Sequence, residues 1–198
     1  MRKIYAVWLL AAWLIAWKMP PVFAATLDFN DLEIPGIDFT YMPDYASQQF
    51  YLTSTEYPNN AFIAPMQGNG LYFGSASLIN QYTSKADTIL REGSNALFTL
   101  DSMQVHDIEG PVNITFFAYD ANSAILGTQQ FNITESSGWN TIDFDSGFSS
   151  VSSVVWQQTE SFAFDNIELN TVVPEPVSCV LFCIGGLTIA AARRLRKK

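Results

Sequence analysis

The chain contains one histidine, His106, which lies beside Asp107 and Glu109. A Ser-His-Asp nucleophile would need this histidine, but no Gly-x-Ser-x-Gly turn accompanies it. Zinc needs several His or Cys ligands, and the two cysteines, Cys179 and Cys183, both lie in an apolar C-terminal tail. Paired carboxylates hydrolyse glycosides, yet with 18 acids in residues 25–172 some pair falls at a suitable separation by chance. The sequence therefore predicts a protein that is not an enzyme.

Aromatic side chains are the better candidates for a binding site, because their faces stack on sugar rings while Asn, Gln and Asp bond the hydroxyls. A group of tyrosines lies in the Pro-, Gly- and Asn-rich segments 31–47 and 54–69, and such loops often carry binding surfaces. Trp139 follows Gly138 at a predicted turn, which favours exposure. We predict a ligand surface that includes Trp139, Trp156, Tyr41, Tyr45 and Tyr57, with core packing as the alternative role of each.

The segments that must position these residues are predicted β-strands. Turn formers recur about every 8 to 12 positions between runs of Phe, Tyr, Ile, Val and Thr, and no long stretch has helical periodicity. We predict strands at 26–30, 49–53, 61–64, 71–74, 96–105, 112–120, 125–133, 140–145, 151–157 and 161–169. This pattern predicts an all-β fold, a two-sheet antiparallel β-sandwich of the jelly-roll type.

Two details of the strand pattern are specific enough to test. Segments 112–120 and 125–133 are predicted to form a hairpin, because the turn formers Asp120-Ala121-Asn122-Ser123 connect them. The apolar alternation slips near Ser102 in segment 96–105, and it changes face midway along segment 161–169. We expect a bulge in the last strand, because an extra residue moves the following side chains to the other face.

The charges are unevenly distributed along the chain. The net charge is −9, from 10 basic and 19 acidic residues. Residues 25–172 hold 18 acids against two bases, Lys85 and Arg91, so this part carries a net charge near −16. Such a surface repels phosphate backbones, which argues against nucleic-acid binding, and it attracts divalent cations or basic partners.

Residues 1–24 are predicted to be a signal peptide that signal peptidase removes. Arg2 and Lys3 precede a short apolar run, and small residues at Val22-Phe23-Ala24 favour cleavage after Ala24. The run is short for a membrane span, which needs about 20 apolar residues. The alternative is an uncleaved anchor. We therefore expect residues 25–170 to form an exported β-sandwich domain.

The C-terminal end has three ordered features. A linker at 171–176 contains Pro174, Glu175 and Pro176, residues 177–192 carry no charge, and 193–198 are rich in Arg and Lys. As a helix, the uncharged segment would be about 24 Å long, which is shorter than the hydrocarbon core of a bilayer at about 30 Å. The long side chains of Arg193 and Arg194 can reach the membrane surface from within the core and make up part of this difference. We predict a single transmembrane helix at 177–192 with the basic tail 193–198 in the cytoplasm.

These three features together resemble the PEP-CTERM sorting signal. The resemblance covers residues 173–198 and implies that Pro174, Glu175 and Pro176 form the motif recognised by exosortase, a membrane transpeptidase-like enzyme. It implies a Gram-negative bacterium that makes extracellular polysaccharide. The chain would be anchored in the inner membrane before processing and would then reach the cell surface or matrix. A plain single-span anchor is the alternative.

The body of the chain more loosely resembles carbohydrate-binding modules and other galactose-binding-like sandwiches. The segments that carry this resemblance include Leu27-Asp28-Phe29 and Phe164-Asp165-Asn166. Related sandwiches often bind a structural calcium where the first and last strands meet, and calcium prefers carboxylate and amide oxygens. The resemblance therefore implies a structural calcium at Asp28 and Asp165, with turn chemistry as the alternative.

Taken together, the sequence predicts an exported surface or matrix protein with a non-catalytic role. We expect it to bind extracellular polysaccharide or to pack structurally within a biofilm. The alternatives are a secreted glycan-active enzyme and a protein–protein adhesion module. Binding predicts a grooved face with exposed aromatic rings, whereas catalysis predicts a deep cleft with two facing acids, of which one has a raised pKa.

Overall fold

A computed structural model describes residues 22–34, 37–55, 61–65, 67, 69–74, 76–80, 87–108, 110–134, 138–158 and 160–172. The predicted signal peptide up to residue 21, Tyr57, the motif Pro174, Glu175 and Pro176, the span 177–192 and the basic tail 193–198 lie outside these residues. Within the described residues, no helix has the length and hydrophobicity that crossing a bilayer requires. Residues 23–171 form one compact unit.

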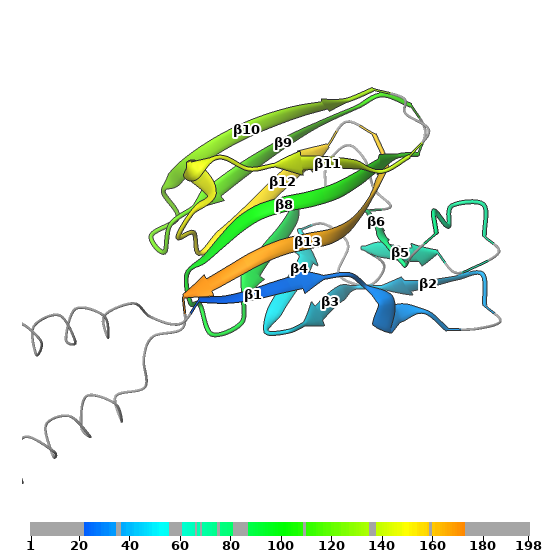
Figure 1. The fold of residues 1–198 in the computed structure, drawn as a ribbon, viewed down its shortest axis with the longest axis horizontal. Helices are drawn as coiled ribbons and strands as arrows, with labels where there is room; N and C mark the ends of the chain where they lie inside the picture. The colour runs from blue at the N-terminus through cyan, green and yellow to red at the C-terminus, as the bar shows by residue number, and fades with distance from the viewer. Residues whose placement is uncertain are drawn as a thin grey trace, which may run out of the picture. The chain divides into compact units, whose positions relative to one another are not determined.

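The described strands form two antiparallel sheets that pack as a sandwich (Figure 1). Sheet A has seven strands in the order β11-β8-β13-β6-β5-β2, with β1 also beside β13. Their bounds are β1 (Val22–Leu27), β2 (Phe39–Met42), β5 (Phe62–Pro65), β6 (Leu78–Asn80), β8 (Phe98–Asp107), β11 (Asn140–Asp143) and β13 (Phe162–Val172). The predicted all-β, two-sheet sandwich is confirmed, and its first and last strands are neighbours.

Sheet B has six strands in the order β10-β9-β12-β7-β4-β3. Their bounds are β3 (Asp44–Ser47), β4 (Phe50–Ser54), β7 (Thr88–Glu92), β9 (Val112–Tyr119), β10 (Ile125–Ile133) and β12 (Ser153–Gln158). Two short 3-10 helices, η1 (Asn30–Leu32) and η2 (Ser146–Phe148), follow β1 and β11. The described part of the chain contains no longer helix, as the sequence predicted.

Four short strands, β2, β3, β6 and β7, were not predicted from the sequence. They have three to five residues each, which is too few to show a clear apolar alternation. Pro43 separates β2, which pairs with β5 in sheet A, from β3, which pairs with β4 in sheet B. A proline donates no ladder hydrogen bond, so the chain passes between the sheets at the residue where pairing must stop.

The strand predicted at 71–74 is wrong. Leu71 N–H donates to the side-chain oxygen of Asn69 at 2.8 Å, and Tyr72 N–H donates to its carbonyl at 3.0 Å. An asparagine that accepts backbone hydrogen bonds in this way forms a turn rather than a ladder. Gly74, with a φ of +100°, ends the segment in a conformation that a side chain would disfavour.

The two irregularities predicted in the alternation are confirmed. In β8, Asp101 and Ser102 are both half-buried between the buried Leu100 and Met103. The pairing of β13 with β8 shifts register between Asp165 and Glu168, where Asn166 has a φ of 45°. The two departures from alternation face each other in the sheet, so the bulge allows both strands to keep apolar residues inside.

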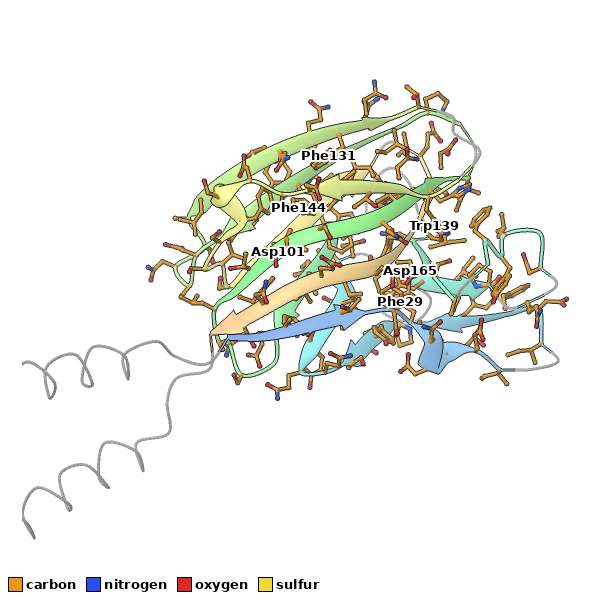
Figure 2. All side chains as sticks on the ribbon, in the orientation of Figure 1. Phe29, Asp101, Phe131, Trp139, Phe144 and Asp165 are labelled. Atoms are coloured by element: carbon orange, nitrogen blue, oxygen red, sulfur yellow. The ribbon has the colours of Figure 1, made fainter. Side chains whose placement is uncertain are left out.

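Aromatic side chains dominate the interior between the sheets. The rings that are almost completely buried are Phe29, Phe50, Phe62, Phe98, Phe116, Phe148, Trp156, Phe162 and Phe164. Phe164 of sheet A lies edge-on to Trp156 of sheet B, with ring centroids 5.4 Å apart, and Trp156 lies 5.6 Å from Phe116. At the side where β10 and β11 form the sheet edges, Phe131 and Phe144 make a similar contact at 5.6 Å (Figure 2).

The hairpin of β9 and β10 is confirmed, with Asp120 at the start of its turn. The Asp120 carboxylate accepts hydrogen bonds from the N–H groups of Asn122 and Ala124, both at 2.8 Å. Ser123 adopts a φ of 64°, and its N–H donates to the Asp120 carbonyl at 3.1 Å. The bond from Ala124 is the main cause that lowers the pKa of Asp120 below its usual value.

We predict that Trp156→Ala lowers the free energy of unfolding by about 3–5 kcal/mol, because it leaves a large cavity between the sheets. Trp156 is fully buried, so the side chains around it lose their contacts with the ring and relax only partly into the space it leaves. Urea denaturation of the full-length chain measures this change. The control variant Thr141→Ala, at an exposed position of β11, should change stability by less than about 0.5 kcal/mol. A Trp156→Ala protein as stable as the control would contradict the packing described.

We also predict a pH-dependent role for Asp120. Because its folded pKa is lower than its unfolded pKa of about 3.9, it stabilises the fold above that pH, and this contribution disappears as the pH falls through the folded pKa. Asp120→Ala should therefore be less stable than wild type at neutral pH. The gap should narrow between about pH 5 and pH 2, as thermal unfolding at a series of pH values would measure. A gap independent of pH would exclude this role.

Candidate functional site

The outer face of sheet B is hollowed by a groove across β7, β9 and β12. Its volume is about 550 Å³, and its lining combines aromatic, aliphatic and polar side chains with one cation: Ile89, Arg91, Asn95, Tyr119, Asp120, Ala121, Ser123, Ser152, Ser153 and Val155. A second hollow of about 260 Å³ is lined by Tyr51, Arg91, Glu92, Gly93 and Asn95. Because both hollows include Arg91 and Asn95, we treat them together as the sheet B groove.

Strand pairing places four side chains of the sheet B groove in one row. Ser153 pairs with Tyr119 on one side and with Arg91 on the other, and Arg91 pairs in turn with Tyr51. Adjacent strands lie about 4.8 Å apart, so the backbones at Tyr119 and Tyr51 are separated by about 14 Å. The row faces outward because the adjoining residue within each of these strands is buried in the core. The two tyrosine rings therefore lie on either side of Arg91.

Close packing fixes the Tyr51 side of the row. Gly93 is the residue after β7, and its N–H donates to the Gln49 carbonyl at 2.7 Å. A Cβ atom at position 93 would collide with Cε2 of the Tyr51 ring. A larger residue at position 93 would therefore displace the Tyr51 ring from its place across the turn. Tyr51 keeps 40% of its surface exposed.

The loops at the rim of the groove are held by their own carboxylates. The buried Glu92 accepts hydrogen bonds from Ser94 N–H at 2.7 Å, Ser94 Oγ at 2.7 Å and Ala96 N–H at 2.9 Å. Across the groove, Ser152 Oγ donates to the carbonyls of Tyr119 at 3.1 Å and Asp120 at 2.6 Å. These bonds fix the backbone on both sides of the groove before any ligand arrives, which lowers the entropic cost of binding.

The chemistry of the sheet B groove is suited to binding. Tyrosine rings can stack on an apolar ring face, and Asn95, Ser123 and Ser153 can bond hydroxyl groups. The acids of the groove, Glu92 and Asp120, accept backbone hydrogen bonds, and the pKa of Asp120 is lowered rather than raised. A general acid needs the opposite shift, so these carboxylates shape the rim and do not resemble a hydrolytic pair.

Part of the outer face of sheet A, around β6 and the start of β13, is covered instead. Ile79 and Ala163 pair with each other and adjoin the core residues Leu78 and Phe164 in their strands, so their side chains point to the outer face. Both residues are nevertheless buried. Beside them His106, which pairs with Ala163, stacks on the Phe73 ring with centroids 3.8 Å apart. The segment that contains Phe73 therefore packs onto this face and leaves less of it open to a ligand.

Trp139 takes part in this cover, on the sheet that holds β8 and β13 (Figure 2). Its indole N–H donates to the Phe73 carbonyl at 3.2 Å, and its ring lies edge-on to Phe73 and His106, at 6.1 and 5.6 Å. The side chain is half-buried. The structure thus gives Trp139 a packing role, away from the row of Tyr119 and Tyr51.

Two of the other predicted aromatic residues are corrected. Trp156 is fully buried, and Tyr45 is 5% exposed with its hydroxyl donating to Asp31 at 2.8 Å; burial raises the pKa of Tyr45 above its usual value. Neither ring can stack on a ligand from solvent, because each faces inward from its strand. Tyr41, on β2 of sheet A, is 45% exposed beside Phe39, and Tyr57 lies outside the described residues.

The predicted calcium ligands do not form a ligand set in the described part of the chain, where no three His, Cys, Asp or Glu side chains gather around one point. The Asp28 carboxylate accepts a long bond of 3.4 Å from Asn30 N–H. Asp165 is buried, and its carboxylate accepts a bond of 2.7 Å from Asn166 N–H in the bulge. The geometry shows turn chemistry at both residues, so a structural calcium at Asp28 and Asp165 stays a prediction.

Sequence reasoning missed Tyr119, Arg91 and Tyr51 as a group. A signal was present for Tyr119, because Val112, Ile114, Phe116 and Ala118 alternate with outward residues along the predicted strand. For Arg91 no such signal existed, since β7 was not predicted. Residues 51, 91 and 119 become neighbours only through the order of strands in sheet B.

Comparisons with known proteins support the fold. No family model matches the chain, and no curated protein sequence matches it. Its structure is similar to that of a DUF4465 family protein from Bacteroides caccae, with a TM-score of 0.51 and 12% identity, over 74% of this chain and 98% of that one. A family 29 carbohydrate-binding module from Piromyces equi matches with a TM-score of 0.43 and 8% identity, over 77% of this chain and 91% of that one. The first similarity shows that the two chains share a fold.

Proposed function

We propose that the protein binds polysaccharide through the sheet B groove, without cleaving it. The observation that carries this proposal is the row in which Tyr119 and Tyr51 lie about 14 Å apart on either side of Arg91. A single sugar ring is much shorter than this distance, so the spacing suits an oligosaccharide that contacts both tyrosines. The loops at the rim are already ordered by internal hydrogen bonds, as a preorganised binding surface requires.

The two alternative functions have weaker support. A glycan-active enzyme would need two facing acids, one of which is free to act as a general acid. The carboxylates of Glu92 and Asp120 instead accept hydrogen bonds from backbone N–H groups of their own loops. An adhesion module has one favourable observation, the exposed apolar side chains Ile34, Ile37, Phe39 and Tyr41 at and before the edge strand β2. This edge is on sheet A, so mutations can separate it from the sheet B groove.

Tyr119→Ala and Tyr51→Ala should each weaken polysaccharide binding by roughly tenfold, because each removes one stacking ring. The full-length chain, purified in detergent, would first be screened on a glycan array, and the dissociation constant for the best oligosaccharide would then be measured by calorimetry. Both tyrosines lie outside the core, so thermal unfolding should change little.

The matched control is Thr141→Ala on the exposed side of sheet A, which should bind as wild type does. Tyr41→Ala tests the other exposed aromatic edge. If Tyr41→Ala abolishes binding while Tyr119→Ala and Tyr51→Ala do not, the ligand site is at β2 and the proposed groove is wrong.

We further propose that the chain is exported and sorted as a PEP-CTERM protein. The support is the order of Pro174-Glu175-Pro176, the uncharged segment 177–192 and the basic end 193–198. Two prolines remove backbone donors and favour an extended segment, which a processing enzyme at the membrane face could reach. Such sorting would place the glycan-binding domain at the cell surface or in the matrix, where extracellular polysaccharide is present.

Replacement of Pro174, Glu175 and Pro176 by alanine should block processing by exosortase. The variant should keep the mass of the unprocessed chain and stay in the inner-membrane fraction, as mass spectrometry and cell fractionation would measure. Val173→Ala is the control, because it changes the adjacent residue and keeps the motif. Normal processing and surface retention of the triple variant would refute the sorting proposal and leave the groove untouched.

A further inference from the structure

We propose that the sheet B groove selects polysaccharides whose sugars carry carboxylate groups, and that the Arg91 guanidinium binds that carboxylate. This inference rests on the proposed function, because it names the class of glycan that the same groove takes. It follows from the position of one cation in a strongly acidic domain.

Arg91 lies at the centre of the groove. It is on β7, whose neighbours in sheet B are β12 and β4, and it lines both hollows. Its register partner on one side is Tyr51, and on the other side Ser153 separates it from Tyr119. A sugar ring stacked on Tyr51 would therefore hold its substituents beside the guanidinium, and a ring on Tyr119 would lie one strand further away.

The guanidinium of Arg91 has no ion-pair partner among the described residues, and the side chain is exposed. The nearby acids are engaged elsewhere: Glu92 accepts bonds from Ser94 and Ala96, and Asp120 accepts bonds from Asn122 and Ala124. The guanidinium is therefore available to a ligand. A carboxylate on the ligand would supply an ion-pair partner with the two-pronged geometry that arginine favours.

The acidic surface around the groove makes the selection sharper. A polyanion is repelled by the rest of a domain with a net charge near −16. It can bind only where its carboxylate meets Arg91, so contacts in other positions are penalised. Neutral glycans lack the attraction at Arg91 but also escape this repulsion. At an ionic strength of about 0.15 M, salt screens charges more than about 8 Å apart, so the direct contact with Arg91 is expected to outweigh the repulsion and an acidic glycan to bind more tightly than its neutral form.

The test compares acidic oligosaccharides with their uncharged esters and with neutral glycans. The full-length protein would be titrated with polygalacturonate and alginate oligosaccharides, with the methyl or propylene glycol ester of each, and with neutral mannan and cellulose oligosaccharides. We expect at least one acidic form to bind roughly tenfold more tightly than its ester. Arg91→Gln should remove this difference, and Arg91→Lys should keep part of it because the charge remains.

Two further measurements make the outcome specific. Tyr119→Ala should weaken binding of the acid and its ester by the same factor, since stacking does not depend on the carboxylate. Thermal unfolding of Arg91→Gln should match that of wild type, because the side chain is exposed. If neutral or esterified glycans bind as tightly as the acids, or if Arg91→Gln weakens both forms equally, the inference is wrong and the proposed function stands. If no polysaccharide binds, the proposed function fails, and the inference fails with it.

Discussion

The contact of Trp156 with Phe164 between the two sheets determines which side chains reach solvent. Successive residues of a strand point to opposite faces. Once Trp156 and its aromatic neighbour Phe116 point inward, the alternate residues of β12 and β9 must point outward. The same register carries over to β7 and β4 through their ladders. The outward row of Tyr119, Ser153, Arg91 and Tyr51 is therefore a consequence of core packing.

The two acids of the groove, Glu92 and Asp120, stabilise the local backbone structure. Asp120 organises the β9–β10 turn, and Glu92 organises the loop between β7 and β8. Each carboxylate accepts backbone donors that a short loop could not otherwise satisfy. A high count of acids therefore says little about catalysis here, because those that line the groove are already used to hold the loops.

The sequence predicted the long elements of the fold well, because long strands show their alternation. The β9–β10 hairpin, the slip at Ser102 and the bulge near Asn166 were all visible in the pattern of apolar residues. Short strands such as β7 were not, and strand order within a sheet is not a local property. For this reason the sequence pointed to Trp156, a conspicuous aromatic residue that is buried, and it missed Arg91.

The two sheets also differ in what covers them, and this difference is the strongest reason to place ligand binding on sheet B. On sheet A, the outward residues Ile79 and Ala163 are buried, and Phe73, His106 and Trp139 pack together beside them. On sheet B, the corresponding outward row contains Arg91 and Tyr51, which remain exposed. The segment that covers sheet A shields the aromatic rings of that face from solvent. The loops beside sheet B are held at the edge of the groove and leave its face accessible. Because the carboxylates of Glu92 and Asp120 hold the loops at the rim, the same local bonds that build the turns keep the groove open.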